Sequence, residues 1–501
     1  MSTFADPLAR GAQIAGNRTA LISGGRQFTY REFQSRCSRL ATVLRNAGAK
    51  PGDRIAVLAA NSHHYIECYV AIPAAGFVIV PLNTRHAEPE LRYAMEDAGA
   101  SMLISDRDPG ALREIVDSVV MVPDELDELI ETAIETELGT DVTEESLAGL
   151  FYTGGTTGAS KGVMLTHRNL IANAYHFMTL GTPSSDAVSL IMAPLFHAAG
   201  SNGVLAAIWS GSCQIPLEVF DAATALDLME KHHVTHTLGV PTMIAAIAEL
   251  QLVEPRDTSS LQVIAHGGSP VATEVIRRAA EAFPMAEFQH VYGMTEGSPL
   301  VTGLRNEQDL LDVARSRSCG QTLIGVQVRI IDDEGDEVPV GDVGELAARG
   351  PNIMKGYWNK PEQTAEVLKD GWYRSGDMGY MDDEGFVFLV DRAKDMIVSG
   401  GENVYCSEVE EALYKHPDVL EAAVFGVPDE AWGEAVHAVV VPRGEVKPEE
   451  LIEFCRQHIA GYKLPKAITL SADELPKSGP GKILKRELRK PFWEGRDSNV
   501  N

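Results

Sequence analysis

Hydrophobic and polar positions in the first hundred residues follow two alternating patterns. Short apolar runs, which predict buried strands, occupy 54–60 (RIAVLAA), 78–83 (VIVPLN) and 101–105 (SMLIS). Between them lie helical patterns, from His63 to about Ala75 and across EPELRYAMEDAG, where Pro89 stands near the start. Strands that alternate with helices need crossover connections, so this part of the chain predicts a largely parallel sheet covered on both faces.

The next segments are an acidic stretch and a glycine-rich loop. Residues 123–147 contain no Lys or Arg, which is typical of a solvated surface excursion. Residues 151–163 follow directly and read FYTGGTTGASKGV. The segment LTHRNLIANAYHFM then predicts a helix with Thr166 as its N-cap, so the lysine loop is expected between a strand and a helix.

The pattern changes again near Asp391. The last hundred residues predict a helix at 407–415, strands in AAVFGV and AVHAVVVP, a helix opened by Pro448, and a basic tail. These elements suffice for a small α+β domain with its own core. We therefore expect two domains, 1–392 and 393–501.

Composition and charge narrow the class of protein. A chain of 501 residues is too long for one core, and a net charge of -28 argues against nucleic acid as a partner. The longest apolar stretch, near 69–82, is broken by Pro73 and Gly76, so no integral membrane association is expected, and neither end carries a targeting signal. Six cysteines without a CxxC pair predict reduced thiols and a cytoplasmic protein; they are Cys37, Cys68, Cys213, Cys319, Cys406 and Cys455.

The glycine-rich loop is not a P-loop. Walker chemistry needs Lys directly after Gly and Ser or Thr directly after Lys, but Ser160 precedes Lys161 and Gly162 follows it. The segment GPGKIL fails in the same way, because Ile483 follows Lys482. What remains is a set of hydroxyls, glycine backbone N–H groups and one cation, which either wraps a polyphosphate or forms a flexible linker.

The order of motifs along the chain carries a family resemblance. FYTGGTTGASKGV resembles the phosphate-binding signature of the adenylate-forming superfamily, which contains acyl-CoA synthetases, luciferases and nonribosomal adenylation domains. Over roughly 28–489 the chain is similar to fatty-acid and 4-coumarate–CoA ligases. Seven further segments match in family order: APLFHAAG, GGSP, VYGMTEGSP, GELAARGPNIMKGYWNKPEQT, GWYRSGD, DRAKDMIVSGGENVY and LPKSGPGKILKREL.

The resemblance implies an α/β fold in which a large N-terminal domain of αβαβα-type layered sheets carries a small mobile α+β domain. It implies an ATP-dependent carboxylic acid–CoA ligase that forms AMP and uses ATP, Mg²⁺ and coenzyme A. A carboxylate would attack ATP to give acyl-AMP and pyrophosphate, and CoA would then take the acyl group. The alternatives are an enzyme of the same fold that hands the acyl group to a carrier protein or another acceptor, and a non-catalytic binding protein. A homodimer is one expected assembly.

The same resemblance implies roles for individual residues in nucleotide binding. Tyr292 would stack on adenine, Thr295 would bind the α-phosphate, Glu296 would hold Mg²⁺, and Asp377 would bind the ribose hydroxyls. The full nucleotide set is Thr153, Gly154, Gly155, Thr156, Thr157, Gly158, Lys161, Gly268, Ser269, Pro270, Tyr292, Gly293, Met294, Asp377 and Arg392.

Further roles fall on the C-terminal domain. Lys482 would be the catalytic lysine that reaches the carboxylate and α-phosphate, together with Thr295, Glu296 and His197 on the N-terminal side. Lys394 would be the hinge of a domain rotation between the half-reactions. Candidates for contacts to CoA are Gly400, Gly401, Trp432, Tyr462, Lys463 and Lys466.

The acid is left open between two classes. Expected pocket residues are mostly small and include no Asp or Arg for a charged amino acid; they are His197, Ala199, Gly200, Gly239, His266, Gly267, Gly268 and Pro299. Such a pocket suits a medium-to-long fatty acid or an aryl or hydroxycinnamic acid such as a feruloyl-type substrate.

Two departures and two histidine groups complete the sequence picture. The chain has Gly154 where the family usually has serine and Ser160 where it has proline, which predicts a less constrained loop and at most weaker ATP affinity. Two histidine groups, His63/His64 with Cys68 and His232/His233 with His236, lack an HExxH or CxxC companion, so catalytic zinc is not expected.

Overall fold

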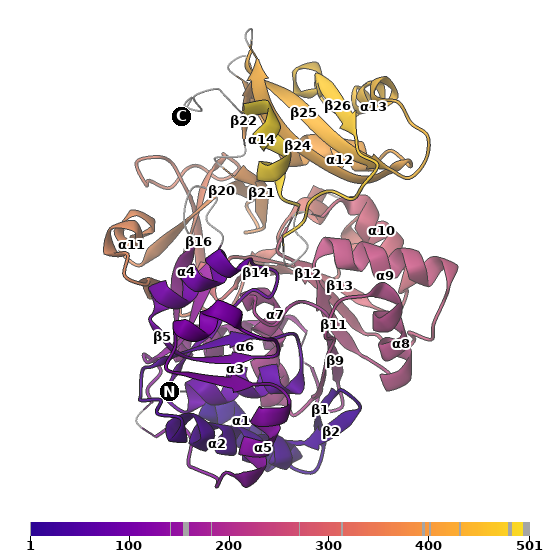
Figure 1. Cartoon of the computed structure of the whole chain (residues 1–501). Coiled ribbons are helices and arrows are strands. Elements are labelled where there is room, and N and C mark those ends of the chain that lie inside the picture. Colours follow the sequence, from indigo (N-terminus) through magenta and orange to yellow (C-terminus); the bar gives the residue numbers. More distant parts are fainter. Residues whose placement is uncertain are drawn as a thin grey trace.

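The computed structural model describes residues 2–140, 142–153, 160–181, 183–269, 271–311, 314–392, 396–399, 402–429, 432–478 and 483–493. Within these ranges the chain is a mixed α/β structure with four β-sheets. Three sheets belong to a large N-terminal part, and the fourth belongs to a small C-terminal part at one end of the molecule (Figure 1).

The largest sheet has nine strands and a parallel centre. In spatial order its strands are β15 (Gln321–Thr322), β14 (Leu300–Leu304), β13 (Glu287–Gly293), β12 (Val263–Gly267), β11 (His236–Gly239), β9 (Val188–Ile191), β10 (Cys213–Pro216), β1 (Thr19–Ser23) and β2 (Arg26–Thr29). The strands from β13 to β1 are parallel neighbours, and the outer strands β14, β15 and β2 pair antiparallel. The carboxyl ends of β11, β12 and β13 therefore meet at one edge.

The second sheet has seven strands. Its order is β18 (Gly356–Tyr357), β8 (Lys161–Thr166), β7 (Leu147–Thr153), β4 (Val78–Pro81), β3 (Arg54–Leu58), β5 (Ala100–Ser105) and β6 (Ser118–Met121). The five strands from β7 to β6 are parallel, whereas β8 and β18 run antiparallel to their neighbours. The strands predicted at 54–60, 78–83 and 101–105 and the largely parallel character of the sheet are confirmed.

Helices flank these two sheets (Figure 1). They are α1 (Ala5–Ala15), α2 (Tyr30–Asn46), α3 (His63–Ala74), α4 (Glu88–Ala98), α5 (Asp124–Thr132), α6 (His167–Leu180), α7 (Ala198–Ser210), α8 (Ala222–His232), α9 (Pro241–Val253), α10 (Thr273–Ala282) and α11 (Pro361–Val367), with short 3₁₀ turns η1 (Gly110–Glu114), η2 (Thr295–Gly297), η3 (Glu307–Leu310) and η4 (Ala314–Arg317). The predicted N-cap of α6 is confirmed, because the Thr166 side chain accepts a hydrogen bond from the backbone N–H of Asn169.

Two expectations from the sequence are wrong. The acidic stretch 123–147 is not only a solvated excursion, because α5 buries Leu126 and Ile130, which stand four residues apart on one helix face. The lysine loop does not run from a strand into a helix. Its second half enters strand β8, which pairs with β7 so that Thr153 faces Lys161, because KGVMLT presents apolar side chains to the core.

A third, antiparallel sheet joins the large part to the small one. It contains β16 (Gln327–Ile331), β17 (Gly344–Arg349), β20 (Trp372–Met381) and β19 (Leu368–Lys369), with β21 (Val387–Arg392) paired to β20. In the β20–β21 ladder Asp377 faces Arg392. The end of β21 is thus next to one of the predicted ribose-binding residues.

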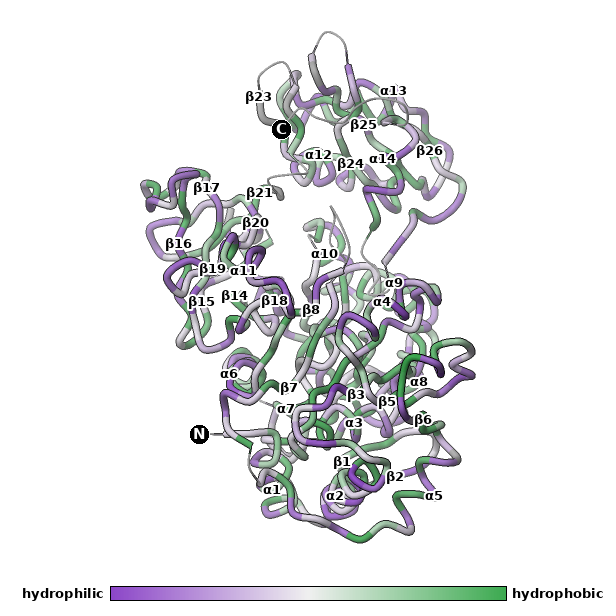
Figure 2. Tube along the Cα trace, turned by 60° about the vertical axis from the view of Figure 1, so that its left-hand side comes forward, coloured by the Kyte–Doolittle hydropathy of each residue, from purple (hydrophilic) through white to green (hydrophobic). Residues whose placement is uncertain are grey.

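The C-terminal part has a core of its own. Its elements are β22 (Ile397–Ser399), β23 (Glu402–Val404), α12 (Cys406–Tyr414), β24 (Val419–Asp429), β25 (Gly433–Pro442), α13 (Pro448–Cys455), η5 (Gly461–Lys463), β26 (Ala467–Leu470) and α14 (Lys485–Trp493). One hydrophobic cluster draws its buried members from 397–468 alone, which confirms the predicted small α+β domain. In Figures 1 and 2 these elements gather at one end of the molecule.

Two further properties bear on the class of protein. All six cysteines are free and buried, as expected for reduced thiols. Across the described ranges we find no helix with the length and apolar character that a membrane span requires.

Candidate active site

The predicted nucleotide motifs lie at the carboxyl edge of the nine-stranded sheet. Gly267 ends β12 and is followed by Gly268 and Ser269, while Tyr292 and Gly293 end β13. In open α/β sheets, ligands bind in the crevice outside the carboxyl ends of the strands. The fold therefore places both motifs where such a ligand would sit.

Two glycines at this edge are required by close backbone packing. A Cβ on Gly293 would lie 1.6 Å from the carbonyl oxygen of Pro299, and one on Gly267 would lie 2.2 Å from that of Val291. Neither backbone oxygen can move away without breaking the strand ends. These positions need glycine for the fold, whatever they also do for a ligand.

Tyr292 and Asp377 form a buried pair that joins β13 to β20. The Tyr292 hydroxyl donates a 2.7 Å hydrogen bond to Oδ2 of Asp377, and both residues are more than nine-tenths buried. Burial, and then the Asp377 carboxylate, raises the pKa of Tyr292 well above its usual value, so the hydroxyl stays a neutral donor. Ser375 accepts a 3.1 Å hydrogen bond from the Asp377 backbone N–H and holds the strand on the other side.

The turn that carries Thr295 and Glu296 is fixed by Asn352. Nδ2 of Asn352 donates to the carbonyl oxygens of Gly297 (2.9 Å) and Leu300 (2.7 Å), and the backbone carbonyl oxygen of Asn352 accepts from the Ser298 hydroxyl (2.6 Å). Asn352 is completely buried. The η2 turn is thus held rigidly against the segment 350–354, although Met294, Thr295 and Glu296 belong to another part of the sequence.

Tyr357 brings Glu296 and Lys161 to one place. Its hydroxyl donates a 2.8 Å hydrogen bond to Oε1 of Glu296, and its ring centre lies 4.7 Å from Nζ of Lys161. Burial, and then Glu296, raises the pKa of Tyr357, so this hydroxyl also remains a donor. Carboxylate oxygens are the ligands that Mg²⁺ prefers, so an oriented Glu296 beside the phosphate-loop lysine fits a magnesium–polyphosphate group.

The base of the glycine-rich loop is closed by Ser160. Its Oγ donates a 2.6 Å hydrogen bond to the carbonyl oxygen of Thr153 across the hairpin, and its own carbonyl oxygen accepts from the Tyr93 hydroxyl at 3.0 Å. The expectation that Ser160 leaves the loop less constrained is therefore wrong at the loop base, because the serine hydroxyl makes a bond that the usual proline could not.

Several predicted residues lie outside the described residues. They are Gly154, Gly155, Thr156, Thr157, Gly158, Pro270, Lys394, Gly400, Gly401 and Lys482. For Arg392 the structure describes the strand position alone. The roles that the resemblance gives these residues stay predictions.

A small cavity of about 40 Å³ lies between the nine-stranded sheet and helices α6 and α7. Of the expected acyl-pocket residues, Ala199 and Gly200 are among the described residues that line it. A Cβ on Gly200 would lie 1.9 Å from the carbonyl oxygen of Pro194, so this glycine also lets the start of α7 approach the preceding loop.

The other expected pocket residues lie elsewhere. His197 is the N-cap residue of α7, and Gly239 abuts Met243 and Ile244 of α9. His266 is completely buried; its Nε2 lies 2.5 Å from Glu307, and its ring stacks on His290 with centroids 4.9 Å apart. Gly239 and His266 are neighbours across β11 and β12 and lie on the α9 side of the sheet.

Two lysine–aromatic pairs mark the candidate CoA surface of the C-terminal part. Lys466 Nζ lies 5.2 Å from the ring centre of Trp432, and Lys463 Nζ lies 5.5 Å from that of Tyr462. Both rings are substantially exposed. Lys463 is also held by Glu408 at 2.6 Å, so its ammonium group is oriented by two neighbours.

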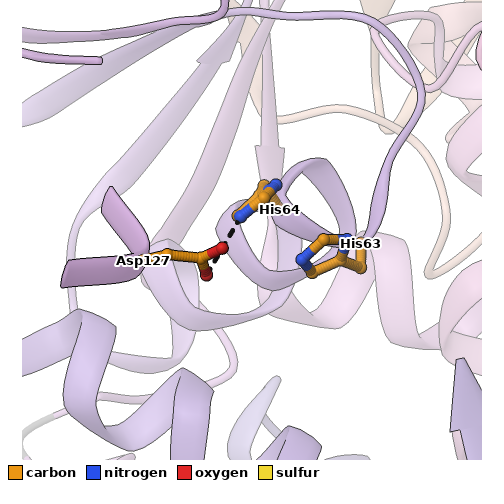
Figure 3. A group of neighbouring side chains, drawn as sticks. All are labelled: His63, His64 and Asp127. Carbon is orange, nitrogen blue, oxygen red and sulfur yellow. Dashed lines mark ion pairs between the residues drawn. The ribbon is translucent and has the colours of Figure 1, made fainter. Parts of the chain in front are cut away.

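One of the two histidine groups noted in the sequence gathers beside an acidic residue. His63 and His64, at the start of α3, lie beside Asp127 of α5 (Figure 3). Asp127 is already paired with His64 (3.2 Å), Arg26 (2.8 Å) and Arg36 (2.5 Å). Two guanidinium groups would repel a metal cation there, so we assign this cluster the structural task of tying α5 to α2 and α3.

Tyr357 and Asn352 are the functional candidates that sequence reasoning did not single out. Both lie in GELAARGPNIMKGYWNKPEQT, which carries part of the family resemblance but no predicted role. The signal available in the sequence was that this segment is the longest of the ordered motifs. The contacts to Glu296 and Lys161 themselves require the fold.

Comparison with known proteins agrees with this geometry. The family model described as "AMP-binding enzyme" matches residues 8–358, and that described as "AMP-binding enzyme C-terminal domain" matches residues 408–482. Together the two models cover most of the chain.

Individual relatives span nearly the whole length. A feruloyl-CoA synthase of Amycolatopsis sp is 42% identical over 490 residues, covering 96% of this chain and 98% of that protein. The fatty acid–[acyl-carrier-protein] ligase ScoC of Streptomyces coeruleorubidus is 35% identical, with coverage of 98% and 96%. The o-succinylbenzoate–CoA synthetase of Bacillus subtilis, solved with ATP and a magnesium ion, superposes with a TM-score of 0.86 at 30% identity, covering 97% of this chain and 99% of that one.

Proposed function

The chain belongs to the AMP-binding enzyme family and is an acid–thiol ligase that uses ATP, Mg²⁺ and coenzyme A, and from that premise we propose that it activates an aryl or fatty carboxylic acid in two steps. In the first step a carboxylate oxygen attacks the α-phosphorus of ATP, which forms acyl-AMP and releases pyrophosphate. In the second step the CoA thiolate attacks the acyl carbon, which forms the thioester and releases AMP.

The single observation that carries the proposal is the meeting of Lys161, Tyr357 and Glu296. A carboxylate is a poor nucleophile toward a polyanion, so the first step needs cationic groups arranged around the phosphates before reaction. The ring of Tyr357 lies beside Lys161, and its hydroxyl bonds to Glu296. The tyrosine thereby fixes the phosphate-loop cation relative to the metal-binding carboxylate.

Each residue then has a defined task in adenylation. The ring of Tyr292 stacks on adenine, and Asp377, which Tyr292 orients, accepts hydrogen bonds from the ribose. Lys161 and the Thr153–Gly158 loop bind the β- and γ-phosphates, and Thr295 binds the α-phosphate. Glu296 would hold Mg²⁺, which would supply charge neutralisation for the departing pyrophosphate.

The C-terminal part supplies the remaining groups. We place the domain boundary at 392/393, just after β21 ends at Arg392 and before β22 begins at Ile397. Lys482 stabilises the charge that moves from carboxylate to phosphate, and Arg392 binds ribose and phosphate from the hinge side. Rotation of the C-terminal domain about Lys394 then removes Lys482 from the active site and brings Gly400 and Gly401 to it.

The aromatic pairs on the small domain suit the nucleotide of CoA. Trp432 and Tyr462 offer exposed rings for an adenine, and Lys463 and Lys466 offer cations for its phosphates. The enzyme acts in the cytoplasm, where buried free thiols such as these stay reduced.

A second acceptor is the main alternative. The relative ScoC is named for transfer to an acyl carrier protein, so the same fold serves an acceptor other than CoA. The lysine–aromatic pairs favour free CoA as the acceptor. The adenine of CoA can stack on the aromatic ring of a pair, and its phosphates can bind the lysine.

The deciding experiment is a pyrophosphate-release screen over fatty, aryl and short acids with the purified full-length protein. Each acid is tested with ATP and Mg²⁺, with and without CoA, and products are identified by mass spectrometry. The proposal expects CoA-dependent acyl-CoA and AMP from at least one acid. Adenylate formation that CoA does not accelerate, together with transfer to an acyl carrier protein, would favour the alternative.

A further inference from the structure

The cavity beside α7 is lined by one face of the nine-stranded sheet. In the strand register Gln214 of β10 pairs with Ser189 of β9, Ser189 with His236 of β11, and His236 with Val263 of β12. Residues that pair in this way point to the same face of a sheet. All four line the cavity, so they form one row across its wall.

The opposite face of the same strands is mostly apolar, with Thr237 of β11 and His266 of β12 as polar members. Leu190, Ile215 and Ile264 alternate with that row and belong to the hydrophobic core to which α8, α9 and α10 contribute. The polar side chains Gln214, Ser189 and His236 are therefore confined to the cavity side. Their placement is not the result of a generally polar sheet.

Gln214 is the unusual member of the row. It is 1% exposed, and within the described ranges neither its Oε1 nor its Nε2 has a hydrogen-bonding partner. A buried amide with both its donor and its acceptor unsatisfied is costly, and native proteins rarely keep one without a use. The other buried glutamine of the cavity, Gln289, differs because its Nε2 donates to the carbonyl oxygen of Leu180 at 3.1 Å.

The row lies toward the amino ends of the parallel strands, away from the edge that carries the nucleotide motifs. Val263 begins β12 and Gly267 ends it, so the row is four residues, roughly 13 Å at 3.3 Å per residue, from the edge that carries the nucleotide motifs. A cinnamic acid whose carboxylate is at that edge directs its aromatic ring and para substituent toward the row. At about 40 Å³ the cavity has room only for the distal group of such an acid, which would lie against the lining side chains.

We propose that the Gln214 amide hydrogen-bonds a hydroxyl at the distal end of the acid, so that the enzyme selects hydroxylated aromatic acids over unsubstituted aryl acids and fatty acids. The hydroxyl donates to Oε1 and accepts from Nε2, which satisfies both amide atoms. A terminal methyl group of a fatty acid in the same place would leave both unsatisfied. This inference rests on the proposed function and names its substrate class.

The test compares three acids on the full-length enzyme: 4-hydroxycinnamic, cinnamic and dodecanoic acid, each with ATP, Mg²⁺ and CoA. We expect kcat/KM for 4-hydroxycinnamic acid to exceed that for cinnamic acid by about 10- to 100-fold. In Gln214→Leu this ratio should fall to near unity through loss on the hydroxylated acid, while activity on cinnamic acid is kept.

A matched substitution controls for the loss of a buried glutamine. Gln251 is similarly buried, but its amide bonds to the backbone of Arg256, and it is not among the described residues that line the cavity. Gln251→Leu should leave the ratio of the two kcat/KM values unchanged, whatever it does to stability.

The outcomes separate this inference from the proposed function. Equal kcat/KM for the two cinnamic acids in the wild type, a preference for dodecanoic acid, or an unchanged ratio in Gln214→Leu would overturn the inference and leave the ligase intact. Absence of a CoA thioester from every acid would instead overturn the proposed function. If Gln214→Leu does not fold, the wild type decides alone, with 4-hydroxycinnamic acid expected above 4-methylcinnamic acid.

Discussion

The hydroxyl of Tyr357 donates a 2.8 Å hydrogen bond to Oε1 of Glu296. The same side chain places its ring 4.7 Å from Nζ of Lys161, so one tyrosine ties the predicted metal ligand to the phosphate-loop lysine. These residues come from three separate segments of the chain. Substitutions at these contacts therefore test the proposed metal and phosphate site.

Tyr357→Phe should lower kcat/KM for ATP in adenylation by about tenfold. The variant keeps the ring beside Lys161 and removes only the hydrogen bond to Glu296, and a bond to a charged group contributes about 1.5–3 kcal/mol. Pyrophosphate release at varied ATP and Mg²⁺ measures the effect. Tyr414→Phe, which removes a buried hydroxyl in the C-terminal domain, is the control and should retain ATP kinetics. Wild-type kinetics in Tyr357→Phe would mean that the hydroxyl does not orient Glu296 for catalysis.

Tyr292→Phe should raise KM for ATP more than it lowers kcat. The phenylalanine ring still stacks on adenine, but Asp377 loses the 2.7 Å hydrogen bond that orients its carboxylate toward the ribose. We expect a several-fold to tenfold rise in KM, consistent with about 1 kcal/mol for one hydrogen bond. Comparison of ATP with 2′-deoxy-ATP supplies the check: the variant should discriminate between them less than the wild type, and equal discrimination would contradict the ribose assignment.

Ser160→Ala should weaken ATP binding about threefold by opening the loop base, because the hydroxyl bond to Thr153 is worth about 0.5–1.5 kcal/mol.

Gly154→Ser, which adds a hydroxyl to the loop, should leave ATP affinity unchanged or improve it. Both effects are measured as KM for ATP and by direct titration. A large drop in affinity for Gly154→Ser would show that the glycine is required rather than tolerated.

His63→Phe should stabilise the protein at acid pH. Burial, and then His64 and Arg36, lowers the pKa of His63 from 6.5 to about 3, so between these values the unfolded chain binds a proton that the folded chain does not. Folded-state stability therefore falls as pH drops below 6.5. The ring stacks on Phe28, with centroids 4.6 Å apart, and within the described residues neither ring nitrogen has a hydrogen-bonding partner, so Phe preserves the packing.

The expected gain for His63→Phe at pH 5 is about 2 kcal/mol in the free energy of unfolding, with a smaller change at pH 7.5. Thermal melting at the two pH values measures it. His458→Gln, at an exposed position, is the control substitution. A gain for His63→Phe that is equal at both pH values would assign the effect to packing rather than to protonation.

The elements with strong local signals were predictable from sequence. The alternation of apolar runs and helical periods gave the parallel sheets, and the Thr166 cap gave the start of α6, because both depend on neighbours within a few residues. The α5 helix was missed since its two buried residues, Leu126 and Ile130, are surrounded by acidic residues. Strand β8 was missed because the glycine-rich loop before it suggested a strand-to-helix turn.

The candidate site was predictable as a set of residues but not as an arrangement. The ordered motifs pointed to Tyr292, Glu296, Asp377 and Lys161. The roles of Tyr357 and Asn352 depend on contacts between segments far apart in sequence, which no local pattern encodes. Gln214 stands in the short buried strand CQIP, where only the register across β9 and β11 shows that it faces a cavity.

The central claim is that the acid is activated as an acyl-adenylate, and isotope transfer tests it most directly. The enzyme is given 4-hydroxycinnamic acid labelled with ¹⁸O in both carboxylate oxygens, together with ATP, Mg²⁺ and CoA, and the products are analysed by mass spectrometry. Attack of the carboxylate on the α-phosphate predicts one ¹⁸O atom in each AMP and none in pyrophosphate. Label in inorganic phosphate with release of ADP, or unlabelled AMP alongside the thioester, would contradict the account.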